Sequence, residues 1–309
     1  MPQPEEPIYG HIDLHTHSSV SDGTMAPGEL FMLAQEIGLK AVALTDHDNI
    51  NGLPEFLAAG REHPECEAIP GVEVACSFMC REIHIVGLFI DYRSPALQEF
   101  LAQAKQERFR RNRDLLVKLE LLGYKLSMDM PEFSGCELSE AGRPHFAKAL
   151  VNHYGFPGMH AVFDKLLGHN RPAYIPRRLP SPEAAIKAIH AAGGIAVWAH
   201  PVQRDSNERA YLTRAAKKLA AMGLDGIEGY YSMFSANETA LVTEVAGRYG
   251  LAISGGSDFH GENSPSVVLG FGAGGLRVPV ELLAALKARR IAVAGADSES
   301  QGGHDFENI

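Results

Sequence analysis

Residues 12–18 read Ile12-Asp13-Leu14-His15-Thr16-His17-Ser18, so that a short apolar run ends in two histidines with one residue between them. In an extended strand, residues i and i+2 point to the same face, so both imidazoles project together. Neutral imidazole is a common ligand for zinc, manganese and iron, and the pair therefore predicts a metal clamp at a strand end. One His-x-His can also arise by chance among 14 histidines, so the interpretation depends on the rest of the chain.

Other short apolar runs are followed by polar residues of the same kinds. The runs cover residues 40–44, 67–74, 83–89, 195–199 and 251–254, and helical patterns separate most of them. Ligands at the carboxyl ends of successive parallel strands are the arrangement of a β/α-barrel active site. The candidate metal ligands are His15, His17, Asp22, His47, Glu73, His84, His200, Asp258 and His260.

Taken together, the motifs HTH (15–17), TDHD (45–48), the single His200 and SDFH (257–260) resemble those of the polymerase and histidinol phosphatase (PHP) superfamily of metallophosphoesterases. The resemblance covers most of residues 8–290. Within the superfamily, the blocks at 142–147 and 171–176 are most similar to bacterial enzymes that act on 3′,5′-nucleoside bisphosphates and, in some members, trim RNA from its 5′ end. The resemblance implies a distorted seven-stranded barrel and two or three divalent metal ions, with manganese expected and iron or zinc as alternatives.

The order of the patterns predicts an α/β barrel. About seven strands can be counted, which fits the distorted (β/α)7 TIM-like barrel that the resemblance implies, built from residues 8–94 and 176–290. A long helical pattern begins at Pro95, and short helical pieces follow it. We expect residues 95–175 to form an inserted helical domain over the barrel mouth, because a loop after a strand's carboxyl end emerges on the catalytic face. Residues 291–309 have little apolar content and are predicted to be disordered.

The chain is acidic, with a formal net charge of −10 over 309 residues. An acidic surface repels the phosphate backbone of nucleic acid, so any site for a nucleotide or short RNA must be a local basic patch. The four cysteines at 66, 76, 80 and 136 form no metal-binding CxxC pair and predict reduced, mostly buried thiols.

No signal peptide is recognised, and no apolar stretch approaches the ~20 residues that a bilayer requires. We therefore expect a cytoplasmic protein without membrane contact. No stable protein partner is predicted, and the oligomeric state is left open.

The candidate ligands fit the hydrolysis of phosphate esters, for which clustered cations activate water and neutralise developing charge. Two ions need bridging carboxylates, and Glu73 and Asp258 are available. Mixed nitrogen and oxygen ligands suit Mn²⁺, Fe²⁺ or Zn²⁺ better than Mg²⁺. The expected nucleophile is water at the metals, with no protein side chain assigned as the base. Asp13 and Asp46 could orient imidazoles or make ordinary strand-end hydrogen bonds.

Basic residues in the insertion are candidates for gripping the substrate. The predicted substrate-binding residues are Arg108, Arg111, Asn112, Arg143 and His145. The planar fork of arginine binds phosphate through two hydrogen bonds, so Arg111 and Arg143 are the preferred pair. Arg177 and Arg178 are weaker candidates, because a charge pair in a loop is usually only solvated.

These residues and the resemblance predict a metal-dependent phosphoesterase that releases the 3′-phosphate of nucleoside 3′,5′-bisphosphates, with 5′-3′ exoribonuclease action on short 5′-phosphorylated RNA as a further candidate. Histidinol phosphate phosphatase is the nearest alternative, although its cationic substrate favours acidic contacts. An amidohydrolase commonly bridges its metals with a modified lysine at strand four, where this chain has His84. A polymerase proofreading module normally belongs to a longer chain. A degenerate, non-catalytic binding module should have lost ligands.

Overall fold

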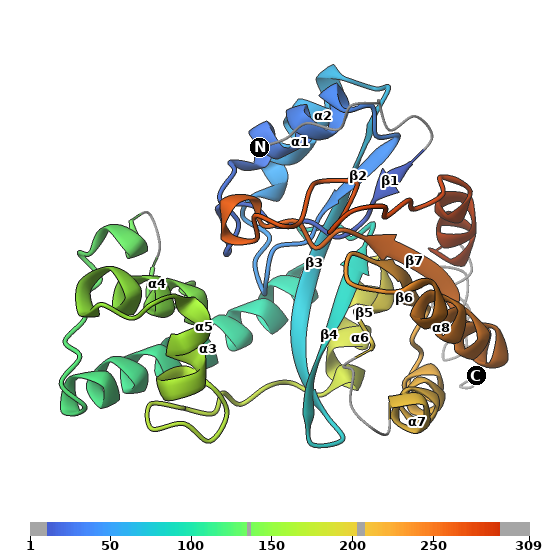
Figure 1. The fold of residues 1–309 in the computed structure, drawn as a ribbon. Coiled ribbons are helices and arrows are strands. Elements are labelled where there is room, and N and C mark those ends of the chain that lie inside the picture. Colours follow the sequence, from blue (N-terminus) through green and yellow to red (C-terminus); the bar gives the residue numbers. More distant parts are fainter. Residues whose placement is uncertain (1–10, 135–136, 203–207, 291–309) are drawn as a thin grey trace, which may run out of the picture.

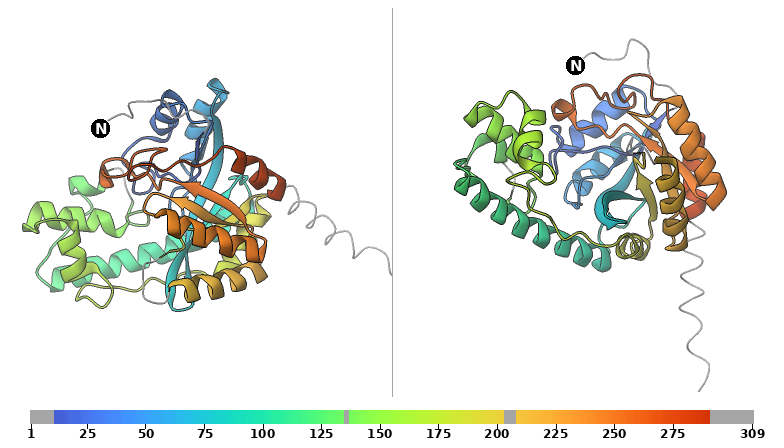
Figure 2. Two further views of the ribbon diagram at one scale, coloured as in Figure 1. Left: turned by 45° about the vertical axis from the view of Figure 1, so that its right-hand side comes forward. Right: turned by 60° about the horizontal axis from the view of Figure 1, so that its bottom comes forward.

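Seven strands form one sheet in the order β1 to β7, surrounded by helices (Figures 1 and 2). The structure is a computed structural model that describes residues 11–134, 137–202 and 208–290. The strands are β1 (Ile12–Asp13), β2 (Ala41–Leu44), β3 (Glu67–Phe78), β4 (Arg81–Leu88), β5 (Ile195–Ala199), β6 (Gly226–Tyr231) and β7 (Ala252–Gly256). The sheet closes because the Leu14 amide donates to the Gly255 carbonyl, 3.1 Å, and Thr16 pairs with Phe259. The predicted seven-stranded α/β barrel is therefore confirmed.

The expectation that the ligands follow successive parallel strands is wrong for β4. This strand runs antiparallel to both β3 and β5, and His84 lies within it, opposite Ala75 and Ala199. The cause is the two-residue turn Met79-Cys80, whose φ angles are 49° and 63°. Such a turn can join only antiparallel strands, since a parallel crossover needs a dozen or more residues. The turn also exposes Cys80, whereas Cys66 and Cys76 are buried.

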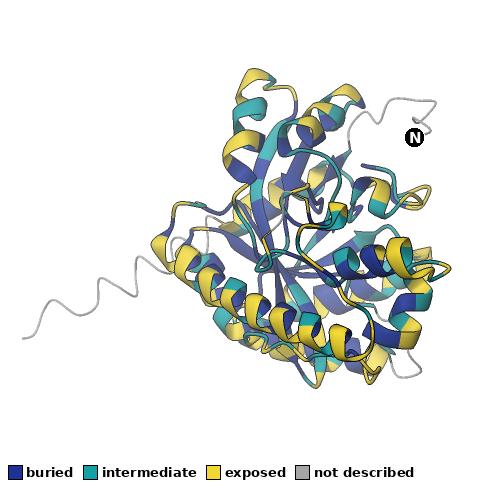
Figure 3. Ribbon diagram, turned by 90° about the vertical axis from the view of Figure 1, so that its left-hand side faces the viewer, coloured by how far each residue is buried: buried dark blue, intermediate teal, exposed yellow. Residues whose placement is uncertain are grey.

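Alternation along the strands separates the barrel interior from the layer beneath the helices. In β2, Ala41 and Ala43 belong to the interior cluster, while Val42 and Leu44 pack in the outer cluster. Strand β5 repeats this pattern, with Val197 inside and Trp198 outside. Both strands are buried throughout, as expected for strands covered on both faces. In Figure 3, dark blue marks the buried residues, which gather in the interior of the barrel.

The covering helices are α1 (Pro27–Glu36), α2 (Leu53–Glu62), α6 (Pro182–Ala191), α7 (Glu208–Ala221) and α8 (Ala236–Tyr249), and residues 281–290 are also helical. Local signals set their ends. In α8, the Ser235 hydroxyl accepts from the Glu238 amide, the Glu238 side chain accepts from the Ser235 amide, and Gly250 ends the helix with φ 66°. No helix of the described residues combines the length and apolar content that crossing a bilayer requires.

Between β4 and β5 the chain leaves the barrel and forms a separate helical unit (Figure 1). It contains α3 (Pro95–Leu121), η1 (Pro131–Phe133), α4 (Arg143–Tyr154), α5 (Met159–Val162) and the π-helical turn η2 (Phe163–Leu167). Helix α3 has 27 residues and is about 40 Å long. The unit has its own hydrophobic cluster, which includes Leu119, Phe133 and Phe146. We interpret residues 95–175 as an inserted domain on this basis; residues 8–10 and 291–309 of the predicted boundaries lie outside the described part of the chain.

Candidate active site

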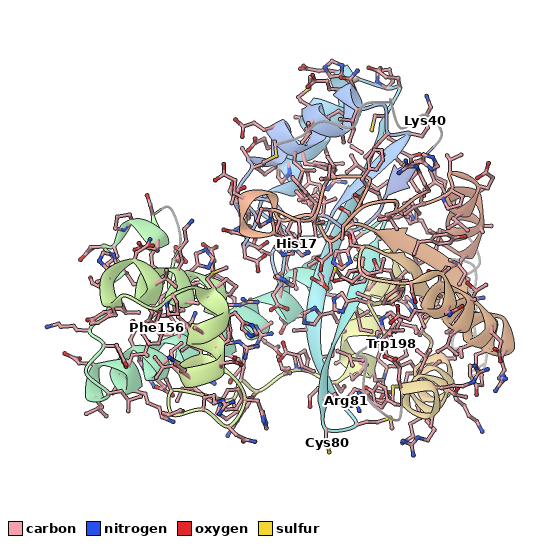
Figure 4. All side chains as sticks on the ribbon, viewed as in Figure 1. His17, Lys40, Cys80, Arg81, Phe156 and Trp198 are labelled. Carbon is pink, nitrogen blue, oxygen red and sulfur yellow. The ribbon has the colours of Figure 1, made fainter. Side chains whose placement is uncertain are left out.

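Four acidic and imidazole side chains meet at the centre of the barrel mouth, where Figure 4 labels His17. His15 and His17 follow β1, Glu73 lies in β3, and Asp258 follows β7. The Nε2 atoms of His15 and His17 each lie 3.3 Å from a Glu73 carboxylate oxygen. The same nitrogens lie 3.5 and 3.2 Å from Asp258 Oδ1. Two carboxylates therefore bridge the histidine pair.

The other five candidate ligands join the same cluster. The oxygens of Glu73 lie 2.9 Å from His47 Nδ1, 2.8 Å from His84 Nδ1 and 3.1 Å from His200 Nε2. Asp22 lies 3.6 Å from His47 Nε2 and 3.2 Å from His260 Nε2. The structure thus brings all nine side chains together, although they come from segments nearly 250 residues apart.

Seven of the nine side chains form three overlapping groups, and the donor atoms of each group lie within 4.8 Å of one another; His200 and Asp258 belong to none of these groups. The groups are His17, Asp22, His47 and His260; His15, His17 and Glu73; and His47, Glu73 and His84. His15 Nε2, both ring nitrogens of His17, and Glu73 Oε2 are buried without a hydrogen-bond partner. Such atoms are costly to bury unless something binds them, and imidazole and carboxylate donors suit divalent transition metals. The residues therefore fit a centre of divalent metal ions.

The electrostatics of the cluster agree with this fit. Although burial opposes ionisation, the imidazoles of His84, His15 and His47 hold the pKa of Glu73 well below its usual range. Burial opposes protonation of His84 as well, but the Glu73 carboxylate raises its pKa to about 10. Burial and the neighbouring His260 and His47 lower the pKa of His17 to about 3. Protons on the imidazoles balance the carboxylate charge that metal ions would otherwise balance, so metal binding should displace these protons.

Three site residues have left-handed backbone conformations, with φ of 50° at Asp48, 30° at His200 and 58° at Asp258. Hydrogen bonds hold each of them: Asp48 N donates to Glu73 O, 2.8 Å, and Asp258 N donates to His15 O, 2.9 Å. His200 N donates to Glu228 Oε2, 2.6 Å. Non-glycine residues in this region cost about 1–3 kcal/mol each and cluster at functional sites.

Glu228 and Tyr231, both in β6, support the ligands and were missed from the sequence. Glu228 Oε1 lies 3.1 Å from His15 Nδ1, which leaves His15 Nε2 facing Glu73 and Asp258. The Tyr231 hydroxyl donates to Asp258 Oδ2, 3.0 Å. A signal existed for Glu228, because a carboxylate inside a buried strand needs a partner.

Asp13 and Asp46 do not bond to imidazoles. Asp13 accepts from the amides of Ser257 and Gly270, 2.8 Å each, and so ties β1 to the segments after β7. Asp46 accepts from the amide and hydroxyl of Ser18 and from the Ser21 hydroxyl, 2.6–2.8 Å. Of the two roles considered for these carboxylates, the structure shows the ordinary hydrogen bonding.

One cavity of about 230 Å³ lies between the metal-binding cluster and the inserted unit. Asp22, His47 and His84 line it at the barrel mouth. The inserted unit and the segment that returns from it contribute Arg108, Arg111, Arg143, Phe163, Tyr174, Ile175 and Arg177. A substrate in this cavity can therefore touch the candidate metal ligands and the arginines at once.

The arginines divide into two pairs. Arg108 and Arg177 both donate to Asp48 Oδ2, at 2.8 Å for Arg177, so one barrel carboxylate holds the outgoing and the returning segment of the insertion. Arg111 is 8% exposed, and its Nε and Nη1 have no hydrogen-bond partner. Burial and the cations of Arg108, Arg177 and Arg143 lower the pKa of Arg111 to about 9. Neither Arg111 nor Arg143 forms an ion pair with a described residue, although the charge of Glu82, which also lines the cavity, acts on both. The four arginines outnumber this carboxylate, so this part of the cavity can bind an anion.

The remaining two predicted substrate-binding residues do not line the cavity. Asn112 is fully buried and donates to the carbonyls of Leu138 and Ala141, 2.6 and 2.8 Å. His145 Nδ1 accepts from the Gly142 amide, 3.1 Å, at the beginning of α4. Both contacts hold the loop that leads to Arg143. Sequence spacing alone could not show whether Asn112 and His145 contact the substrate or this loop.

Comparison with known proteins identifies relatives of this chain. Residues 13–194 match the family described as PHP domain. A Chromobacterium violaceum protein named 3′,5′-nucleoside bisphosphate phosphatase is 38% identical over 81% of this chain and 87% of its own length. The 5′-3′ exoribonuclease Rnm of Salmonella typhimurium is 35% identical over 84% of this chain and 87% of its own length. A solved structure described as an amidohydrolase from Chromobacterium violaceum, with bound sulfate and no metal, superposes with a TM-score of 0.79 at 34% identity, covering 90% of this chain and 96% of that one.

Proposed function

The chain belongs to the PHP domain family, and we propose that it is a metal-dependent phosphoesterase that converts nucleoside 3′,5′-bisphosphates to nucleoside 5′-monophosphates and phosphate. One observation carries this proposal: the same cavity is lined by candidate metal ligands at one end and by arginines at the other. A substrate with two phosphates satisfies both ends. The name of the Chromobacterium violaceum relative supports the same substrate class.

At the barrel mouth, the clustered side chains would hold two or three divalent ions. Their mixture of imidazole and carboxylate suits Mn²⁺, Fe²⁺ or Zn²⁺, and we expect manganese from the resemblance to the PHP family. Bound ions would supply a nucleophilic water and neutralise charge on the 3′-phosphate. The protein contributes geometry. Glu73 and Asp258 lie between His15 and His17, and Glu228 fixes the ring of His15.

At the other end, Arg111 and Arg143 would bind the 5′-phosphate, which does not react. Arg111 gives the stronger support for this site. A buried guanidinium without a hydrogen-bond partner lowers the stability of the protein until an anion binds it. Asp48 holds Arg108 and Arg177 beside this site, and both arginines line the cavity. The 5′-phosphate thereby places the 3′-phosphate at the metal-binding cluster.

Exoribonuclease action on short 5′-phosphorylated RNA is the second candidate, favoured by the similarity to the Salmonella typhimurium enzyme. The chemistry is the same, since the attacked phosphorus is attached to the 3′ oxygen in both substrates. Histidinol phosphate fits less well, because its amine would face arginines. The presence of all nine candidate ligands is an argument against a non-catalytic module, which should have lost some of them.

A phosphate-release assay with added Mn²⁺ tests the proposal. We expect adenosine 3′,5′-bisphosphate to be hydrolysed faster than adenosine 3′-monophosphate, AMP or histidinol phosphate, and 5′-phosphorylated RNA to release mononucleotides from its 5′ end. Chelation and dialysis should abolish activity, and Mn²⁺ should restore it. Faster hydrolysis of histidinol phosphate, or full activity without metal, would refute the assignment.

A further inference from the structure

A second basic cleft of about 300 Å³ adjoins the active-site cavity on the far side of Arg111. One wall is a face of α3, where residues three or four apart point the same way. The other wall is the returning segment after Tyr174. The lining residues are Glu107, Arg110, Arg111, Asp114, Ile175, Pro176, Arg177 and Arg178. Arg111, Ile175 and Arg177 line both the cleft and the cavity, so the two spaces meet at these side chains.

The charge of the cleft is unbalanced in favour of cations. Glu107 is paired with Arg110, and Asp114 is paired with Arg113, 2.9 Å, which lies outside the lining. Arg178 is exposed and forms no ion pair with any described residue. Arg143 lines the cavity, Arg111 lines both spaces and Arg178 lines the cleft, and none of the three forms an ion pair with a described carboxylate. In a protein with a net charge of −10, this is a local track for a polyanion.

The residues that line the cleft also indicate whether it suits additional phosphate groups or a further nucleotide. The cavity is lined by two aromatic residues, Phe163 and Tyr174, which are candidates for stacking on a base. The cleft has no aromatic side chain, and its apolar residues are Ile175 and Pro176. Sites for successive nucleotides of single strands usually combine positive charge with stacking rings. A basic cleft without rings is better suited to phosphates that carry no base.

We propose that this cleft binds the additional phosphates of a 5′-polyphosphate, so that the enzyme also accepts 3′-phosphorylated nucleotides with a 5′-diphosphate or 5′-triphosphate. This inference rests on the proposed function, in which Arg111 and Arg143 bind the first 5′-phosphate. The extra phosphates pass Arg111 and reach Arg178. The reaction itself is unchanged: water adds to the 3′-phosphorus, the 3′ oxygen leaves, and the 5′-polyphosphate stays intact in the product.

The test compares kcat/KM for adenosine carrying a 3′-phosphate and either a 5′-monophosphate or a 5′-diphosphate, with adenosine 3′-monophosphate as the third substrate. We expect the wild type to hydrolyse the 5′-diphosphate about as well as the 5′-monophosphate. Arg178→Ala should lower the ratio of the two values, diphosphate over monophosphate, by about two- to fivefold, the usual effect of one exposed charge contact. Arg171→Ala is the matched control, because Arg171 is an exposed arginine that precedes Tyr174 and lies outside both linings, and it should leave the ratio unchanged.

Two outcomes would overturn the inference: a 5′-diphosphate hydrolysed more than about tenfold slower than the 5′-monophosphate by the wild type, or an equal effect of Arg178→Ala on both. The failure of the proposed function looks different. In that case adenosine 3′-monophosphate would be as good a substrate as the 3′,5′-bisphosphate, and the first 5′-phosphate would have no site. A clear preference for the bisphosphate together with rejection of the diphosphate would reject the cleft alone.

Discussion

The two ends of the cavity are opposite in charge and in what completes them. At the barrel mouth, Asp22, Glu73 and Asp258 converge with imidazoles, and buried nitrogens remain without partners. At the insertion, guanidinium groups converge, and Arg111 remains buried without a partner. In the proposed function, cations complete the first end and an anion completes the second. The barrel would then supply the chemistry, and the insertion would supply the choice of substrate.

The largest expected loss of activity comes from a substitution in the cluster at the barrel mouth. Glu73 lies 2.8–3.3 Å from five imidazoles, so Glu73→Gln removes the charge at the centre of the cluster without changing its shape. Activity should fall by more than about 100-fold, beyond the usual effect of residues that only orient ligands. The loss should be equal for adenosine 3′,5′-bisphosphate and adenosine 3′-monophosphate. Metal content by elemental analysis should fall too, and full metal content with full activity would contradict the assignment of Glu73 as a ligand.

Breaking the insertion end should affect one substrate only. Arg143→Ala removes a charge-assisted contact of about 1.5–3 kcal/mol, or roughly 10- to 150-fold in kcat/KM for the 3′,5′-bisphosphate. Hydrolysis of adenosine 3′-monophosphate should be nearly unchanged, because that substrate lacks the 5′-phosphate.

Arg143→Lys is the matched variant and should recover part of the loss, since an ammonium keeps the charge without the planar fork. Equal losses on both substrates would show that Arg143 serves the reacting phosphate or the fold. The contrast between the two ends would then be wrong.

Glu228 sharpens the comparison, because it acts at the barrel end without being a candidate ligand. Glu228→Gln should weaken the hold on the His15 ring and lower metal affinity by about 10- to 100-fold. Metal titration should show this shift, and excess Mn²⁺ should restore kcat for both substrates. A loss that excess metal does not restore would argue for a direct catalytic or folding role.

The smallest expected effect is a gain in stability. Arg111→Met replaces a buried, unpartnered cation with an apolar chain, and should raise the free energy of unfolding by about 1 kcal/mol, the lower range for a buried unsatisfied group. The same variant should lose activity on the bisphosphate. Denaturant unfolding of the metal-free protein measures the first effect, and destabilisation by Arg111→Met would mean that Arg111 has a structural partner.

The sequence alone determined the barrel and the set of side chains that meet at its mouth. Both depend on local information: alternation places His15 and His17 on one face, and the apolar runs mark the strands. The rule that ligands follow the carboxyl ends of parallel strands failed only for His84, which lies within the antiparallel β4. Residue chemistry then limits what such a cluster can bind. The arginines could be recognised as candidates for the same reason.

The tertiary structure decided which partners these side chains have. Only folding shows that β4 is antiparallel, that Glu228 reaches the ring of His15, and that Asp48 takes Arg108 and Arg177 while Arg111 stays unpaired. The same is true of Asn112, whose amide binds backbone carbonyls of the insertion. Pairing depends on contacts between residues far apart in the chain, and neither periodicity nor residue type encodes which of several nearby charges a side chain will meet.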